Sequence, residues 1–236
     1  YLWLKAGNWP EESPDFWVNL KSLLPNIKYF EFTGGEPFLI QQHFDLLQYA
    51  VENDYAKNIE IHYNTNGTVF PDSHHLWSHF KHVEVAFSID NTSKRFEYER
   101  YGANWLEVQA NIDRFNLMRS PKFSTQLCLT VNVQNVYYLP EICDWIKAQT
   151  FDHVYFNMLH DPWHMCISRM TPAAQQLVVD RLLAHQFSSR HKAEILRIVQ
   201  FIRNGEGSDG QEFLRKMQIT DKYRQQNLRD THKEIA

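Results

Sequence analysis

Residues 29–40, YFEFTGGEPFLI, place one carboxylate and two glycines directly behind a strand-like run. The run YFEF has the aromatic, β-preferring composition of a strand that ends just before the glycines. Gly34 and Gly35 then present bare backbone that a ligand can approach closely. Glu36 supplies an acceptor for positive charge, and Pro37 stiffens the exit of the loop. A tight turn from a strand into a helix is the alternative interpretation of these residues.

Other unusual polar residues also follow strand-like runs. In parallel α/β sheets and barrels, the strand-to-helix loops converge at the carboxyl edge, where ligands bind. Each site alone has a structural explanation, since Asn-Gly forms turns, Ser-x-Asp caps helices and a strand-end asparagine acts as a hydrogen-bonded spacer. Their repetition at successive strand ends predicts a binding site. The candidate cofactor-binding residues are Gly34, Gly35, Glu36, Asn66, Ser88, Asp90, Arg100, Asn132 and Asn157.

These residue types suit a ligand that carries an ammonium group, a carboxylate and a sugar diol. Glu36 and glycine carbonyls can accept from an ammonium, Arg100 can pair with a carboxylate, and Ser88 or Asp90 can reach a ribose. The sequence contains no nucleophile elbow with ordered triad partners, and no P-loop or GxGxxG fingerprint. No catalytic acid or base is assigned.

Hydrophobic periodicity predicts the elements that position these residues. Strand-like runs begin near positions 29, 59, 82, 123 and 151, and helical patterns separate them, one of them around 76–80. This alternation implies right-handed βαβ crossovers and a parallel sheet. From Thr171 onward only helical patterns remain, around the flexible stretch NGEGSDG. We expect KRFEYER (94–100), apart from Arg100, and the charged C-terminal run to be solvated faces.

Composition narrows the class of protein further. The net charge of −4 and the pI of about 6.3 argue against a nucleic-acid partner. No apolar run is long enough to cross a bilayer and no signal-peptide pattern opens the chain, so we expect no membrane contact. Cys128, Cys143 and Cys166 lie too far apart for a disulfide framework or a close-spaced metal motif, so no metal ligand is assigned and we expect a reducing, cytoplasmic location. His160 and His164, with Cys166, are an alternative soft-metal set in HDPWHMC, where a surface loop is favoured.

The segment FTGGEPFL resembles the GGEP segment of radical S-adenosylmethionine (SAM) enzymes. NTNGT, FSIDNT and FEYERYGANWLEVQANI follow in the order of that superfamily's barrel segments. The ending LRKMQITDKYRQQNLRDTHKEI is similar to the terminal helix of members with a SPASM or shortened twitch extension. The resemblance runs from about Tyr29 to the end. It implies a partial (β/α) TIM-like radical SAM barrel with parallel strands over residues 1–165, lacking its first βα unit, and a helical C-terminal extension over 166–236.

The resemblance also implies a ligand and roles for the candidate residues. Gly34, Gly35 and Glu36 would hold the methionine amino group of SAM, while Ser88 and Arg100 would contact its ribose and carboxylate end. In the family, a reduced [4Fe–4S] cluster donates an electron to the sulfonium, and the 5′-deoxyadenosyl radical abstracts a hydrogen from substrate. Implied partners are a peptide, protein or small-molecule substrate and a reductant such as flavodoxin or ferredoxin. The remaining pocket-lining residues would be Asn66, Asp90, Asn132 and Asn157.

The sequence departs from the family at the cluster. The family's CxxxCxxC motif follows the first barrel strand, which should precede YLWLKAGNWPEESPDFW, and the sequence contains neither. We expect the cluster ligands to lie upstream of Tyr1 in a longer chain, and this sequence alone to be inactive. Two alternatives remain open: a non-catalytic binding module with this fold, and a cluster-free barrel enzyme acting on a small polar metabolite.

Overall fold

The computed structural model describes residues 14–235. The start at Tyr1, and the first βα unit expected before it, lie outside the described residues. Internal contacts divide the chain into two compact units: unit 1 comprises the residues up to 87 with 108–126, and unit 2 comprises 88–107 with the residues from 127 onward. The boundary at residue 165 rests on sequence pattern rather than contacts, and stays a prediction.

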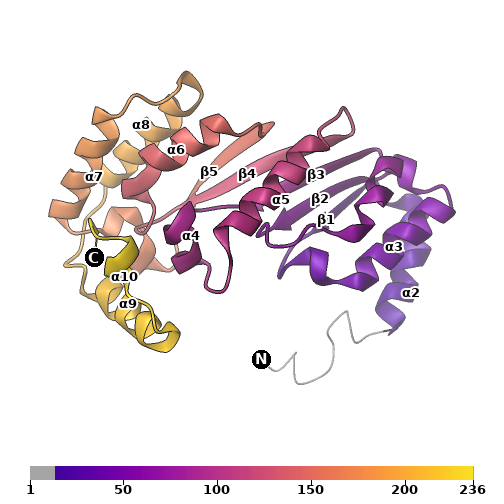
Figure 1. The fold of residues 1–236 in the computed structure, drawn as a ribbon, viewed down its shortest axis with the longest axis horizontal. Coiled ribbons are helices and arrows are strands. Elements are labelled where there is room, and N and C mark those ends of the chain that lie inside the picture. Colours follow the sequence, from indigo (N-terminus) through magenta and orange to yellow (C-terminus); the bar gives the residue numbers. More distant parts are fainter. Residues whose placement is uncertain (1–13, 236) are drawn as a thin grey trace. The chain divides into compact units, whose positions relative to one another are not determined.

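Five parallel strands form one sheet in the order β1-β2-β3-β4-β5, so each strand neighbours the next one along the chain (Figure 1). In unit 1, Tyr29 of β1 pairs with Glu60 of β2, which pairs with His82 of β3. The predicted α/β class with parallel strands is confirmed. The strand bounds are β1 Tyr29–Phe32, β2 Glu60–Thr65, β3 His82–Ser88, β4 Phe123–Val131 and β5 His153–Met158.

Unit 1 buries one face of its strands under helices. Its helices are α2 (Pro14–Leu23), α3 (Gln41–Glu52) and the part of α5 (Trp105–Leu117) from residue 108 onward. The core is aromatic: Trp77 packs on Tyr63 and on Phe115 with ring centroids 5.5 and 6.0 Å apart, and the Trp77 indole N–H donates to the Tyr63 hydroxyl at 3.3 Å. Residues 72–79 form a 3₁₀ helix that begins earlier than the helix expected around 76–80.

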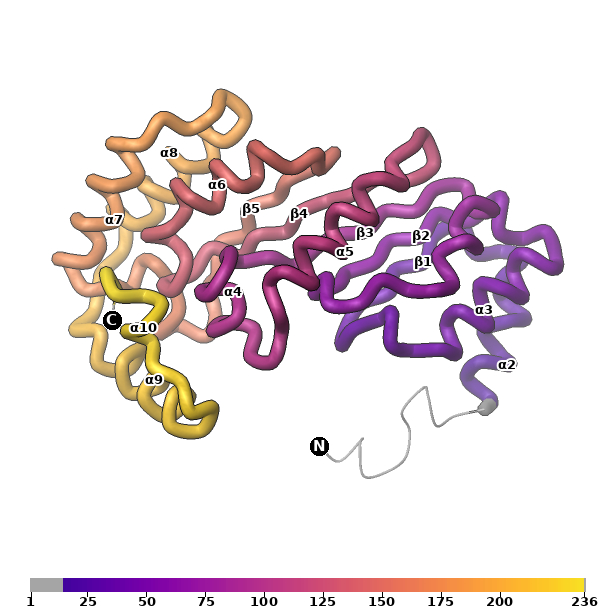
Figure 2. Tube along the Cα trace, viewed as in Figure 1, coloured from indigo at the N-terminus to yellow at the C-terminus, as the bar shows by residue number. Residues whose placement is uncertain are grey.

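Unit 2 is predominantly helical after β5. Its helices are α4 (Ser93–Glu99), α6 (Leu139–Ala148), α7 (Pro172–Ala184), α8 (Ser189–Arg203), α9 (Gln211–Arg224) and α10 (Leu228–Thr231). The Thr171 hydroxyl caps α7 by accepting from the Ala174 N–H at 3.2 Å, as the Thr-Pro pair predicts. The α10 helix lies against α4, although more than a hundred residues separate them in sequence (Figures 1 and 2).

The α4 helix differs from its sequence-based prediction. KRFEYER was expected to be a solvated face, yet Phe96 and Tyr98 are only 0% and 3% exposed. The Phe96 ring packs on the Trp105 ring, with centroids 5.1 Å apart. The Trp105 ring packs in turn on the Trp145 ring, with centroids 5.3 Å apart. That prediction was wrong because charged residues separate the aromatic ones in the sequence and so hide the apolar face of the helix. Over the part of the chain that is described, no helix has the length and apolarity needed to cross a membrane.

Candidate functional site

The loop after β1 combines open backbone with an anchored carboxylate. Gly34 has φ +117, a conformation that favours glycine, and a Cβ at either Gly34 or Gly35 would meet nothing within 4 Å. Both glycines are exposed, whereas Glu36, directly after them, is half-buried. The sequence therefore leaves two peptide units uncovered at the carboxyl end of β1, next to a carboxylate.

Glu36 joins the loops that follow β1 and β2. Its carboxylate accepts from the Thr65 hydroxyl at 2.8 Å and from the Asn66 backbone N–H at 2.9 Å. The Phe38 backbone N–H also lies 3.4 Å from the same carboxylate, so these contacts together hold the group in one orientation. Within unit 1, Glu36 is both a structural cross-link and an acceptor beside the open glycine backbone.

Asn66 and Gly67 form the turn that sequence analysis gave as their structural alternative. The Asn66 side-chain oxygen accepts from the Thr68 N–H at 2.8 Å and from its hydroxyl at 2.6 Å. Gly67 has φ +78, and a Cβ there would lie 3.1 Å from a methyl carbon of Val108. The Asn111 amide donates to the Gly67 carbonyl at 2.9 Å. Asn66 thus shapes the loop beside Glu36 through its side chain.

In unit 2, Asp90 and Arg100 form a partly buried ion pair. An Arg100 terminal nitrogen donates to Asp90 Oδ2 at 2.8 Å, and the two side chains are 30% and 19% exposed. The other Asp90 oxygen accepts from the Thr130 backbone N–H at 2.8 Å, which fixes the carboxylate at the end of β4. The Arg100 Nε is buried and has no hydrogen-bond partner among the residues described. Such an unpaired charged donor is costly unless a ligand accepts from it.

The other predicted residues of unit 2 vary in their surroundings. Asn132 is 8% exposed, and its side chain accepts from the Gln134 N–H at 2.8 Å and donates to the Thr130 carbonyl at 3.1 Å. It therefore builds the turn after β4. Ser88 is half-buried at the end of β3, whereas Asn157 is exposed on β5. Unit 2 brings Asp90 and Arg100 into direct contact, and Asn132 adjoins them through Thr130.

A row of ionisable residues that was not predicted from the sequence crosses β1, β2 and β3. Glu31, His62 and Glu84 are aligned in register, and His62 Nδ1 lies 2.9 Å from Glu84. Asn64, two residues along β2 and therefore on the same face, donates to Glu31 at 3.2 Å. The bond to Glu84 raises the pKa of His62. The alternation of polar residues along β2 in the sequence could have predicted this row, because alternate side chains of a strand share a face. Here that face lies opposite the core and carries the histidine–carboxylate pair.

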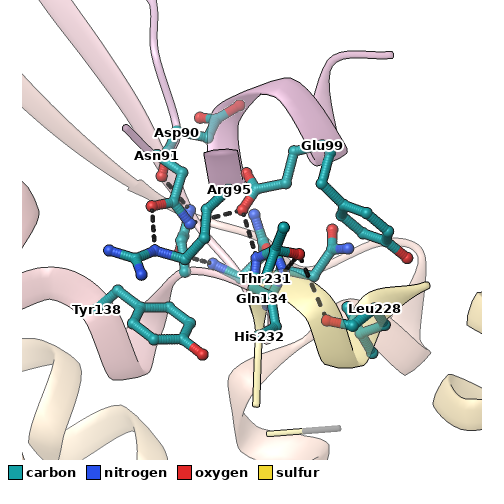
Figure 3. A network of polar contacts seen from close by, with 12 residues as sticks. Asp90, Asn91, Arg95, Glu99, Gln134, Tyr138, Leu228, Thr231 and His232 are labelled. Carbon is teal, nitrogen blue, oxygen red and sulfur yellow. Dashed lines mark hydrogen bonds and ion pairs between the residues drawn. The ribbon is translucent and has the colours of Figure 1, made fainter. Parts of the chain in front are cut away.

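Sequence analysis also missed a buried polar network in unit 2. Glu99 at the end of α4 contacts Asn91 on one side and His232, beside α10, on the other (Figure 3). The basic residues Arg215, Lys222, Arg229 and Lys233 of the charged C-terminal run are exposed, as expected for a solvated face. His232 in the same run is 0% exposed, and helical patterning does not show which element a short helix packs against. The network of Asn91, Glu99 and His232 adjoins the Asp90–Arg100 pair, because Asn91 and Glu99 are the chain neighbours of Asp90 and Arg100.

The cysteines do not fit an iron–sulfur cluster. None of the three cysteines forms a disulfide, Cys143 and Cys166 are buried, and burial raises the pKa of Cys143 to about 12. Cys128 is only partly buried. Over residues 14–235, no three His, Cys, Asp or Glu side chains are grouped in a way that could hold a metal ion. Cluster ligation needs several thiolates close together, and this chain does not bring its thiols together.

A search against family models and a search of curated proteins each found no match to this chain. Among solved structures, the chain shares its α/β fold with anSMEcpe, an anaerobic sulfatase-maturating enzyme of the radical SAM/SPASM type. One anSMEcpe structure with bound S-adenosylmethionine (AdoMet) matches with a TM-score of 0.50 and 19% identity, over 70% of this chain and 47% of that chain.

Two further anSMEcpe structures match equally well. The native enzyme with AdoMet is 20% identical over 72% of this chain and 52% of that chain, with a TM-score of 0.50. A structure with AdoMet and the Kp18Cys peptide is 17% identical over 72% and 53%, again with a TM-score of 0.50. The chain therefore spans about half the length of the structures it matches. At these identities the likeness concerns the fold.

Proposed function

We propose that this chain binds S-adenosylmethionine and is the SAM-binding part of a radical SAM enzyme. The observation that carries the proposal is the pair of open glycine peptides followed by Glu36 at the end of β1. The resemblance of FTGGEPFL to the GGEP segment, and a fold shared with structures that contain AdoMet, support it.

The residues of unit 1 suit the amino group of SAM. Backbone carbonyls of Gly34 and Gly35 and the carboxylate of Glu36 accept hydrogen bonds, and an ammonium donates three. Thr65 and Asn66 hold the carboxylate in place. A Cβ at either glycine would narrow the approach to the backbone. Unit 1 thus supplies an acceptor set that is already held in place.

The residues of unit 2 suit the carboxylate and the ribose. The Arg100 Nε lacks a partner among the described residues, and a carboxylate would accept from it in a charge-assisted bond. Asp90 and Ser88 carry the groups that can bond to ribose hydroxyls, while Asn132 shapes the adjacent turn. Asn157, exposed on β5, is proposed to line the pocket. When bound, SAM supplies a sulfonium whose carbon–sulfur bond is cleaved reductively in radical SAM enzymes.

Radical chemistry would need closely spaced thiolates to hold a cluster, and the three cysteines of this sequence are widely separated. We therefore expect reconstitution of this chain with iron and sulfide to leave no stable [4Fe–4S] cluster after desalting. Stoichiometric bound iron and sulfide with the absorbance of a cubane cluster would contradict this expectation. A cluster held by cysteines outside this sequence, with a reductant such as flavodoxin or ferredoxin, completes the proposed enzyme.

We propose a peptide or protein as the substrate class, with a small molecule as the alternative. The support is the shared fold with an enzyme that was solved with a bound peptide. The separation of the three thiols favours a second candidate function, a SAM-binding module that carries out no radical chemistry.

Equilibrium dialysis of labelled SAM against the full chain tests the proposal. We expect wild-type protein to bind SAM weakly, because the cluster that completes the site in the family is not held by this chain. Gly35→Val should weaken binding at least about tenfold, a loss of about 1.4 kcal/mol. Leu117→Ala, on a residue that is 87% exposed in unit 1, is the matched control and should leave binding unchanged. Equal binding by wild type and Gly35→Val would remove the loop after β1 from the site.

A further inference from the structure

The segment from Asp90 to Arg100 is closed by two polar cross-links. The outer link is the ion pair between Asp90 and Arg100, at 2.8 Å. The inner link joins their neighbours, since the Asn91 amide donates to Glu99 Oε1 at 2.6 Å. Asn91 is 0% exposed. Because the inner link holds the residues next to Asp90 and Arg100, it constrains where the Arg100 side chain begins.

His232 reaches this inner link from the C-terminal part of unit 2. His232 Nε2 lies 3.2 Å from the same Glu99 oxygen, and the two side chains are 0% and 8% exposed (Figure 3). His232 Nδ1 lies 2.7 Å from the Thr231 hydroxyl, which can donate to the Leu228 carbonyl at 3.4 Å. The Thr231 hydroxyl thus meets one imidazole nitrogen while Glu99 meets the other. The carboxylate and imidazole are then both satisfied.

Aromatic rings enclose the pair. The rings of Tyr98 and Tyr138 meet His232 edge-on, with centroids 5.2 and 5.5 Å away. The Tyr98 hydroxyl donates to Asp221, which also accepts from the Leu228 N–H at 2.8 Å and so fixes the start of α10. The buried carboxylate of Glu99 needs hydrogen-bond partners such as His232 and Asn91, because burial without them disfavours its charged form.

Loss of the imidazole would change the state of Glu99. Burial raises the pKa of Glu99, while His232 and Asn91 oppose that rise. The Asp90 carboxylate also raises the pKa of Glu99, and the Arg95 Nε donates to the Asn91 side-chain oxygen at 3.1 Å. Without His232, Glu99 would take up a proton more readily or move toward solvent, and either change alters its bond to Asn91.

We propose that His232 is a positioning residue, which acts through Glu99 and Asn91 to set the Arg100–Asp90 pair for ligand binding. The proposal deepens the proposed function, because it rests on Arg100 and Asp90 contacting SAM. It assigns the C-terminal residues a role in the site, although α10 itself contributes none of the candidate SAM-binding residues.

The test follows the Arg100 side-chain N–H signal by NMR in the full chain. This donor is buried and unpaired, so its signal reports the setting of the guanidinium directly. We expect His232→Ala to shift the signal and to speed its exchange with solvent at least about tenfold. His232→Gln, whose amide can still donate to Glu99, should restore part of the effect. Lys233→Ala, at an exposed neighbouring position, is the control and should leave the signal unchanged.

Each outcome separates this inference from the proposed function. An unchanged Arg100 signal in folded His232→Ala protein would overturn the positioning role. If His232→Ala does not fold, Glu99→Gln keeps the size of the side chain and should shift the same signal, and no shift would again overturn the role. SAM dialysis is run on the same samples. If His232→Ala shifts the Arg100 signal but wild-type protein does not bind SAM, His232 does position Arg100, and the proposed SAM-binding function is wrong.

Discussion

Glu36 in unit 1 and Glu99 in unit 2 are both buried enough to act as cross-links, yet their partners lie at very different sequence distances. Glu36 bonds to Thr65 and to the residue after it, about one βα step further on. Glu99 contacts His232, 133 residues away. The first carboxylate belongs to a short motif that can be read directly. The second belongs to a contact that only folding creates.

The largest effect is expected when Glu99 is removed. Glu99→Ala would leave His232 and Asn91 buried without their shared acceptor. A buried donor left without an acceptor costs about 1–3 kcal/mol of unfolding free energy, and two such donors are affected here. Urea unfolding measures the loss, and Lys233→Ala should stay within about 0.5 kcal/mol of wild type. A loss below about 1 kcal/mol for Glu99→Ala would show that the pair contributes little to stability.

Acid should weaken unit 1 through its own buried histidine. His43 is 1% exposed, its Nδ1 donates to the Ile40 carbonyl at 2.7 Å, and its Nε2 accepts from the Tyr63 hydroxyl at 3.2 Å. Burial lowers the pKa of His43 from 6.5 to about 4, although the bond to the Ile40 carbonyl opposes that shift.

The sign of the effect follows from that direction. Below pH 6.5, His43 is protonated in the unfolded chain but stays neutral in the folded protein until about pH 4. The free energy of unfolding should therefore fall as pH drops from 6.5 to about 4. The shift corresponds to about 3 kcal/mol at most. Urea unfolding across this range should show the slope in wild type, and His43→Gln should reduce it. An identical slope in both proteins would contradict the assignment.

Two glycines of unit 1 should respond differently to the same substitution. Gly67→Ala forces a side chain into φ +78 and against Val108, so we expect a loss of about 2 kcal/mol. Gly35→Ala meets open space and should stay within about 0.5 kcal/mol. Thermal unfolding of the pair checks the difference. Equal losses would indicate that the loop after β1 is more tightly packed than the structure shows.

The smallest effect is expected from His62 on the polar face of the sheet. Its pKa is raised by Glu84, so its stabilising contribution is complete below pH 6.5 and is lost as pH rises through the folded pKa. A cross-strand pair of this kind contributes below about 1 kcal/mol. An NMR titration of the imidazole should show the raised pKa, and Glu84→Gln should lower it. No change in that variant would contradict the pairing.

The sheet and one part of the site could be predicted from the sequence. The strand-like runs and the helical patterns between them predicted a parallel sheet, and the structure has five strands in chain order. The GGEP segment located the loop that carries Glu36. The buried side of α4 could not be predicted, because charged residues separate its aromatic ones. The role of His232 could not be predicted because its partner Glu99 is distant in sequence, and a single histidine in a charged segment carries no pattern.

The central claim is that the open glycine loop of unit 1 binds SAM. The most direct measurement is a titration of the full chain with SAM, followed through the backbone amide signals of Gly34 and Gly35 by NMR. The account predicts that both signals shift and saturate with a dissociation constant near 1 mM or below, which corresponds to about −4 kcal/mol or stronger. Signals at both glycines that stay unmoved by about 5 mM SAM would contradict it.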